Sequence, residues 1–143
     1  MPSVSRTFAV TPPPATVIDY LKDFSNAEQW DPGTQTCTRN DAGPVHEGST
    51  WHNVSKIVGV EAELTYTLES LKPDQLVFVG KNESSTSTDT ISVEAHDGGS
   101  VITYHADLEM HGVAKLLSPA MKLVFEKLAN DTEKQMTEVL NKL

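Results

Sequence analysis

Apolar and polar residues alternate along a central block of the chain, from about residue 34 to residue 110. In its clearest stretch, 60–71, acidic and threonine side chains occupy one face, and the other carries Ala62, Leu64, Tyr66 and Leu68. Successive residues of a strand point to opposite faces, so the alternation predicts half-buried strands. We expect strands at 3–10, 34–40, 49–58, 60–71, 76–79, 84–95 and 101–110.

Apolar residues recur at helical spacing on either side of this block. After the prolines at 12–14, the spacing of Val17, Ile18 and Leu21 predicts a helix over 13–24. A second short helix is expected over 25–30, capped by Ser25 and Glu28. The segment 114–143 predicts one long amphipathic helix, whose apolar stripe is Leu117, Met121, Phe125, Leu128, Thr132, Met136, Leu140 and Leu143.

Turn signals separate the strands. Gly43, Pro44 and Gly48 predict a loop over 41–48, and Gly98-Gly99 predicts a hairpin turn. A curved antiparallel sheet followed by one long helix buries both apolar faces when the sheet wraps around the helix. We therefore expect one α+β domain over 1–143, with a cavity wherever the wrap is loose.

Composition narrows the functional classes. The net charge of −9 and the scattered Lys and Arg argue against nucleic-acid binding. The single Cys37 excludes an internal disulfide. No apolar run approaches the roughly 18 residues that cross a bilayer, and no secretory signal is visible. We expect a cytoplasmic monomer or weak dimer, without membrane insertion and without a cofactor.

Four local patterns resemble a known family. They are Gln29-Trp30-Asp31-Pro32-Gly33; Gly43-Pro44-Val45 with Glu47-Gly48-Ser49; Leu64-Thr65-Tyr66 with Leu71-Lys72-Pro73 and Leu76-Val77-Phe78; and Ser87-Thr88-Asp89-Thr90-Ile91 with Gly98-Gly99-Ser100, Tyr104 and 116–119. Together they resemble the START-like, helix-grip (SRPBCC) superfamily, in its bacterial polyketide cyclase/dehydrase-like branch. The resemblance implies a START/Bet v 1-like fold of six to seven strands, with two short helices after the first strand. That fold hosts binders, transporters and enzymes in one cavity.

Asp89 is the first candidate for chemistry. Its parity with Ile91 and Val93 places it on the inner face, where an apolar cavity would raise the pKa of the carboxyl and let it act as acid or base. The alternative is a structural or solvated carboxylate. Tyr66 and Tyr104 also fall on inner faces, where their hydroxyls could orient a ligand or simply belong to the core.

Parity on the strands and the stripe on the helix define an expected cavity lining. Its members are Trp30, Trp51, Leu64, Tyr66, Leu68, Asp89, Tyr104, Met110, Leu117, Met121 and Phe125. The two tryptophans could equally close the core. Polar residues in the last strand, His105, Asp107, Glu109 and His111, share the opposite face, and their spacing of about 6–7 Å is wide for one metal ion. No metal site is expected.

Three functions stay open at this point. The first is binding of a hydrophobic or polycyclic small molecule, lipid-like or polyketide-like, between the sheet and the last helix. The second is a cyclase, aromatase or dehydratase that uses Asp89, Tyr66 or Tyr104 for proton transfer in the same cavity. The third is a protein-interaction module. An enzyme needs several converging polar groups, and the sequence offers only these three.

Overall fold

The computed structural model describes residues 3–57, 59–111 and 119–143. Its strands are β1 (Ser3–Val10), β2 (Thr34–Arg39), β3 (Thr50–Ile57), β4 (Val60–Lys72), β5 (Gln75–Lys81), β6 (Ser85–His96) and β7 (Gly99–Met110). Its helices are α1 (Pro14–Leu21), the 3-10 turn η1 (Phe24–Asn26), α2 (Ala27–Trp30) and α3 (Pro119–Leu140). The predicted order of strands and helices is confirmed, and strand bounds differ from expectation by at most two residues.

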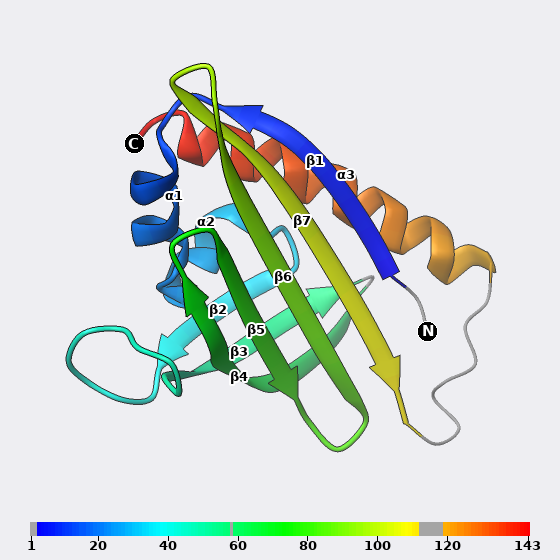
Figure 1. The fold of residues 1–143 in the computed structure, drawn as a ribbon. Helices are drawn as coiled ribbons and strands as arrows, with labels where there is room; N and C mark the ends of the chain where they lie inside the picture. The colour runs from blue at the N-terminus through cyan, green and yellow to red at the C-terminus, as the bar shows by residue number, and fades with distance from the viewer. Residues whose placement is uncertain (1–2, 58, 112–118) are drawn as a thin grey trace.

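All seven strands form one antiparallel sheet in the order β1-β7-β6-β5-β4-β3-β2. Figure 1 shows β2 and β3 running at a steep angle to β6 and β7, so the sheet is strongly curved. Two register shifts, between Thr34 and Thr36 in β2 and between Leu68 and Ser70 in β4, contribute to this bend, because a bulge locally increases strand twist. The curved helix-grip sheet is therefore confirmed.

The expected first helix ends early, at Leu21 rather than residue 24. Asp23 adopts an extended conformation, and its carboxylate accepts a hydrogen bond from the Ser25 amide, which starts the 3-10 turn η1. The predicted cap of Ser25 with Glu28 is wrong, because Glu28 instead accepts from the Cys37 amide of the edge strand β2. A side chain that bonds across the fold in this way cannot be identified from local spacing.

The hairpin between β6 and β7 turns at Asp97 and Gly98, one residue before the predicted pair. Both residues have positive φ, 48° and 81°, as a type I′ turn requires. Gly99 already belongs to the ladder, where it pairs with His96. A Cβ at Gly99 would collide with the Val10 carbonyl oxygen, so this glycine provides close approach between β7 and the end of β1.

Helix α3 packs against the edge strand β1 and runs toward α1 at its C-terminal end (Figure 1). Arg6 joins the two elements: its guanidinium donates to the Asn130 side chain at 2.9 Å and pairs with Glu126 at 3.1 Å. On the helix, Thr132, Met136 and Leu140 of the predicted stripe are buried, whereas Leu143 lies beyond the helix end and is 52% exposed. The predicted start at 114 lies outside the described residues.

Candidate functional site

The inner face of the sheet is packed solid at one end. Inward side chains there have no exposed surface, namely those of Leu68, Leu76, Phe78, Ile91 and Ile102. Phe24 of η1 fills this end, with ring centroids 4.5 Å from both Tyr66 and Phe78 and 6.2 Å from Trp51. The aromatic cluster of Phe24, Trp30, Trp51 and Phe78 thus closes the sheet beneath α1 and α2.

Toward the other end of the same strands, the inward side chains become accessible. Those of Ala62, Ser87, Ala106, Leu108 and Met110 are half-buried. Phe125 of α3 is half-buried as well. Here we call this region, together with Leu64, the open half of the inner face. At this end the inner face therefore carries aliphatic side chains of β4 and β7 that are only partly covered.

The boundary between the packed end and the open half is polar. Tyr66, Asp89 and Tyr104 lie there, with exposed fractions of 8%, 4% and 7%. The Tyr104 hydroxyl donates to one carboxylate oxygen of Asp89 at 3.3 Å, and the Ser87 hydroxyl donates to the other at 3.4 Å. The three site candidates predicted for chemistry therefore come together, on β4, β6 and β7, at the floor of the open half.

Gly80 leaves room for the Tyr66 ring on the inner face of the sheet. Tyr66 pairs with Gly80 of β5, and a Cβ at Gly80 would lie 2.6 Å from the Tyr66 ring. The ring therefore crosses β5 directly over the backbone, toward Ser87 of β6, which pairs with Gly80. Sequence parity predicted the face of Tyr66 correctly, but only the register reveals the role of Gly80.

Burial shifts the titration of these groups. Desolvation, and next the charge of Asp31, raise the pKa of Asp89 to about 7, against the smaller lowering effect of its bonds to Tyr104 and Ser87. Desolvation likewise raises the pKa of Tyr66 and of Tyr104 well above the usual value, so both hydroxyls stay protonated. Asp89 is consequently the group of this row that changes charge near neutral pH.

Asp31 is a second carboxylate that raises the pKa of Asp89, and the sequence pattern did not identify it. It follows α2, and its carboxylate accepts from the Gly33 amide at 3.0 Å and from the Thr34 hydroxyl at 2.9 Å. Desolvation raises the pKa of Asp31 too. A loop residue has no strand parity, so only the three-dimensional position shows that Asp31 adds negative charge near Asp89.

The remaining members of the expected lining fall into three groups. Trp30, Trp51 and Leu68 are wholly buried in the packed end, where the Trp51 indole donates to Asp23 at 3.2 Å. Leu64 and Met110 border the open half. Leu117 lies outside the described residues, as does the side chain of Met121 at the start of α3.

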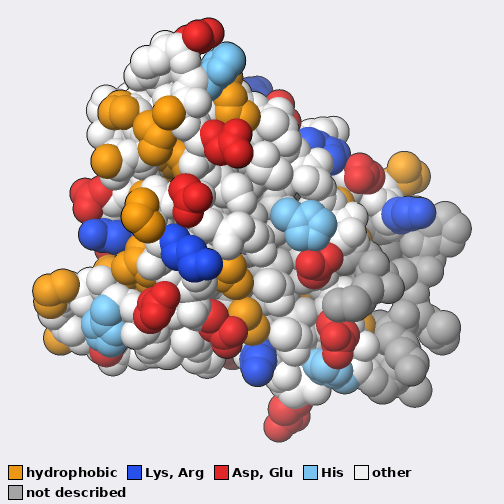
Figure 2. Space-filling view, viewed as in Figure 1, with side chains coloured by type: hydrophobic (Ala, Val, Ile, Leu, Met, Phe, Trp, Pro, Cys, Tyr) orange, Lys and Arg blue, Asp and Glu red, His pale blue; other side chains and the backbone are white. Residues whose placement is uncertain are grey.

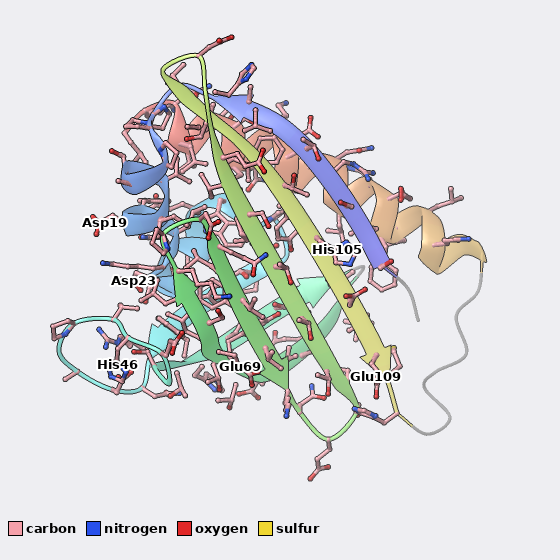
Figure 3. The ribbon with its side chains drawn as sticks, in the orientation of Figure 1. Asp19, Asp23, His46, Glu69, His105 and Glu109 are labelled. Atoms are coloured by element: carbon pink, nitrogen blue, oxygen red, sulfur yellow. The ribbon has the colours of Figure 1, made fainter. Side chains whose placement is uncertain are left out.

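Cys37 and the outer face of the sheet add no reactive group. Burial raises the pKa of the Cys37 thiol to about 12, so a thiolate nucleophile does not form there at neutral pH. His105 pairs with Asp107 at 3.1 Å and His111 with Glu109 at 3.7 Å; Figure 3 shows His105 and Glu109 spaced along β7. Over 3–57, 59–111 and 119–143, no group of three or more His, Cys, Asp or Glu side chains is arranged to hold a metal ion.

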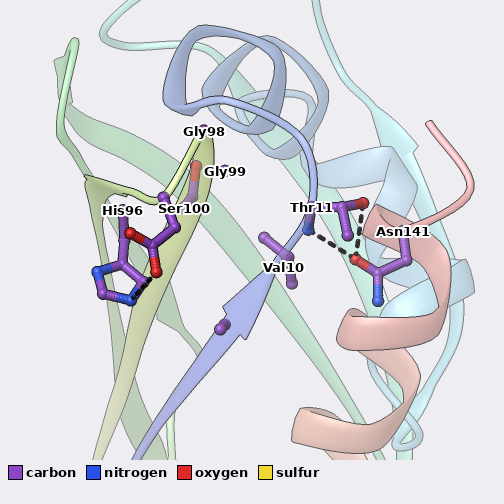
Figure 4. Close-up of a pocket in the computed structure, with 9 residues that line it drawn as sticks. Val10, Thr11, His96, Gly98, Gly99, Ser100 and Asn141 are labelled. Atoms are coloured by element: carbon purple, nitrogen blue, oxygen red, sulfur yellow. Dashed lines mark hydrogen bonds and ion pairs between the residues drawn. The ribbon is translucent and has the colours of Figure 1, made fainter.

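A second hollow lies at the opposite end of the molecule, between the β6–β7 hairpin and the end of α3 (Figure 4). It is an open depression of about 480 Å³, lined by the end of β1, the hairpin and Asn141. Asn141 accepts hydrogen bonds from the amide and the hydroxyl of Thr11, at 2.9 and 3.2 Å. Its polar groups bond mainly to one another, and none of the predicted site residues lies in it.

The surface view does not point to a particular binding partner. Figure 2 shows Lys and Arg side chains dispersed among Asp and Glu on the face turned to the viewer. Among the helices within the described ranges, none is long and apolar enough to cross a membrane. The inner face of the sheet therefore stays the most distinctive feature of the molecule.

Several solved structures share this fold. A START superfamily protein from Mycobacterium smegmatis has a TM-score of 0.80 at 14% identity, covering 98% of this chain and 97% of its own. A protein from Thermus thermophilus has a TM-score of 0.79 at 13% identity, over 96% and 95%. The di-domain ARO/CYC StfQ from the steffimycin biosynthetic pathway has a TM-score of 0.71 at 10% identity, and the match covers 98% of this chain but 50% of that one.

No curated protein sequence matches the chain. A family model does match it, over all of residues 1–143, and its description is polyketide cyclase / dehydrase and lipid transport. That match and the START-like neighbours agree with the seven-stranded curved sheet and its C-terminal helix. Its fold is START-like, and the chain belongs to the polyketide cyclase / dehydrase and lipid transport family.

Proposed function

We propose that the protein binds a hydrophobic or polycyclic small molecule, lipid-like or polyketide-like, between the open half of the sheet and α3. The observation that carries this function is the gradient along the strands, from wholly buried Leu68 and Ile91 to half-buried Ala106 and Leu108 on the same face. Apolar side chains that stay accessible on a concave inner face gain free energy when a ligand covers them. Family membership supports the same class of ligand.

Displacement of an uncharged dye tests this binding directly. We expect Nile red to bind the protein with increased fluorescence and to be displaced by fatty acids or polycyclic aromatics. Phe125→Ala removes contact area on α3 and should weaken binding about 10-fold, which corresponds to roughly 1–2 kcal/mol. Leu123→Ala is the matched control, because Leu123 lies on the same helix and is 73% exposed.

A second substitution fills the open half. Ala106 faces inward beside Asp89 in the ladder, so Ala106→Phe should occupy the space that the ligand needs and abolish dye binding. Native mass spectrometry of the purified protein provides an independent measurement, since a co-purified ligand would appear as added mass. Equal dye affinity in the wild type, Phe125→Ala and Ala106→Phe proteins would exclude the site.

A second candidate function is acid-base chemistry of the cyclase or dehydratase type at the same open half. It is favoured by one observation, the Asp89 carboxyl that is held by Ser87 and Tyr104 and has its pKa raised to about 7, since a general acid or base works best near the ambient pH. An enzyme of this kind should keep ligand affinity in Asp89→Asn but lose turnover by about 100-fold or more. Unchanged turnover of a true substrate would reject this candidate.

A further inference from the structure

Asp89 has hydroxyl partners but no positive partner in the described part of the chain. Its two oxygens accept from Ser87 and Tyr104, and the neighbouring Asp31 adds charge of the same sign. Arg6 of β1 is engaged by Glu126 and Asn130 of α3. A desolvated carboxylate without a counter-charge is costly. When Asp89 is ionised, a cation beside it would supply the missing counter-charge.

Small side chains flank Asp89 on the inner face. Asp89 keeps a 4% exposed fraction, Ser87 is half-buried, and the ladder partner on β7, Ala106, has a side chain of a single carbon. A group that enters from the open half would meet Asp89 at its floor. The Tyr104 ring packs edge-on against the wholly buried Trp30 with centroids 6.1 Å apart, and its hydroxyl bonds to Asp89.

We propose, as an extension of the binding function above, that the ligand carries a protonated amino group that pairs with Asp89 while its apolar body covers the open half. An ammonium donates to carboxylate oxygens and supplies the charge that the hydroxyls of Ser87 and Tyr104 do not. The chain's net charge of −9 also favours approach of a cation. The ligand class is thus an amphipathic amine rather than a wholly neutral molecule.

Two probes of equal shape test this class. The first, 9-(aminomethyl)anthracene, carries an ammonium where the second, 9-(hydroxymethyl)anthracene, carries a hydroxyl. At a pH about one unit above the Asp89 pKa of about 7, we expect the wild type to bind the amine about 10-fold or more tightly than the alcohol, measured by fluorescence titration. Asp89→Asn should lose that preference while its affinity for the alcohol stays within about 3-fold of wild type.

Asp107→Asn is the control variant. Asp107 also lies on the sheet but pairs with His105 on the outer face. Its loss removes one negative charge that acts on Asp89 only as the smallest of the effects on its pKa, and it leaves the side chains of the inner face unchanged. It should keep the preference for the amine. Equal binding of amine and alcohol by the wild type, or a preference that survives Asp89→Asn, would overturn the amine class. If the alcohol and Nile red also fail to bind, the binding function itself is wrong.

A measurement on the wild type alone avoids any dependence on folding of the variant. The charged groups near Asp89 are Asp31 and Asp107, and Tyr66 and Tyr104 stay neutral because their pKa values are raised. Pairing with an ammonium lowers the pKa of Asp89, so amine binding must release a proton at lower pH. Amine affinity should fall by up to about 10-fold per pH unit below pH 7, with alcohol affinity nearly constant. A flat amine profile would contradict the pairing.

Discussion

At the scale of single residues, Asp89 couples protonation to folding. In an unfolded chain an aspartate has a pKa of about 3.9, whereas burial raises the pKa of Asp89 in the fold to about 7. Between these values the folded state holds a proton that the unfolded state has released. The stabilising effect of this proton is complete below about pH 4 and is lost as the pH rises through about 7.

Asp89→Asn should remove this loss of stability. From pH 5 to pH 7 the wild type should lose free energy of unfolding by up to about 1.4 kcal/mol per pH unit through this group, and the variant should show a flatter profile. Asp31, whose pKa is also raised, leaves a slope of the same sign in both proteins. Urea denaturation at several pH values measures the difference, and identical slopes in the two proteins would show that Asp89 is not the buried acid described here.

At the scale of elements, the short η1 turn decides how much of the inner face is closed. Phe24 lies at the centre of the aromatic cluster, 5.8 Å from Trp30 and 4.5 Å from Phe78. The side chain is 1% exposed, although it is positioned by only three residues of 3-10 helix. Asp23 fixes that turn through its bond to the Ser25 amide and also accepts from Trp51.

Phe24→Ala should therefore be strongly destabilising, by about 3–5 kcal/mol, because it leaves a cavity between elements that cannot collapse onto one another. Phe125→Ala is the informative comparison. Phe125 is half-buried at the open half, so its truncation should cost clearly less stability while weakening ligand binding. Urea midpoints of both variants test the pair; equal losses of stability would mean that the inner face is not divided into a packed and an open part.

The sequence predicted the presence of the helices and strands better than the residues at which they begin and end. Alternation over 60–71 and around Ile91 identified β4 and β6, because a strand with one buried face has an unambiguous period of two. It placed the β6–β7 turn one residue late, since Asp97-Gly98 and Gly98-Gly99 are both good hairpin turns and only the pairing of His96 with Gly99 distinguishes them. Of the site, parity predicted the shared face of Tyr66, Asp89 and Tyr104. The contribution of Asp31 depends on tertiary position, which no local pattern contains.

At the scale of the whole molecule, the two ends of the sheet have different roles. The end closed by α1, η1 and α2 supplies the core, and the end flanked by β4, β7 and α3 keeps apolar side chains accessible. The polar row of Tyr66, Asp89 and Tyr104 lies where these parts meet. A ligand at the open half would therefore meet hydrogen-bonded polar groups at the boundary, while its body covers the half-buried apolar side chains.

Hydrogen exchange should map this division. A ligand at a free concentration of about 100 times its dissociation constant stabilises the protein by roughly 2.7 kcal/mol. Amides that exchange through local opening of the ligand site should then exchange more slowly. We expect the slowing of amide exchange, measured by mass spectrometry of peptides, to be greatest in 60–66, 85–89 and 104–110. Little local effect is expected at 91–93. Slowing confined to 9–11 and 96–100 would instead place the ligand in the hollow beside Asn141. In that case the closed end would carry the function, and the open half would have to be explained by another partner.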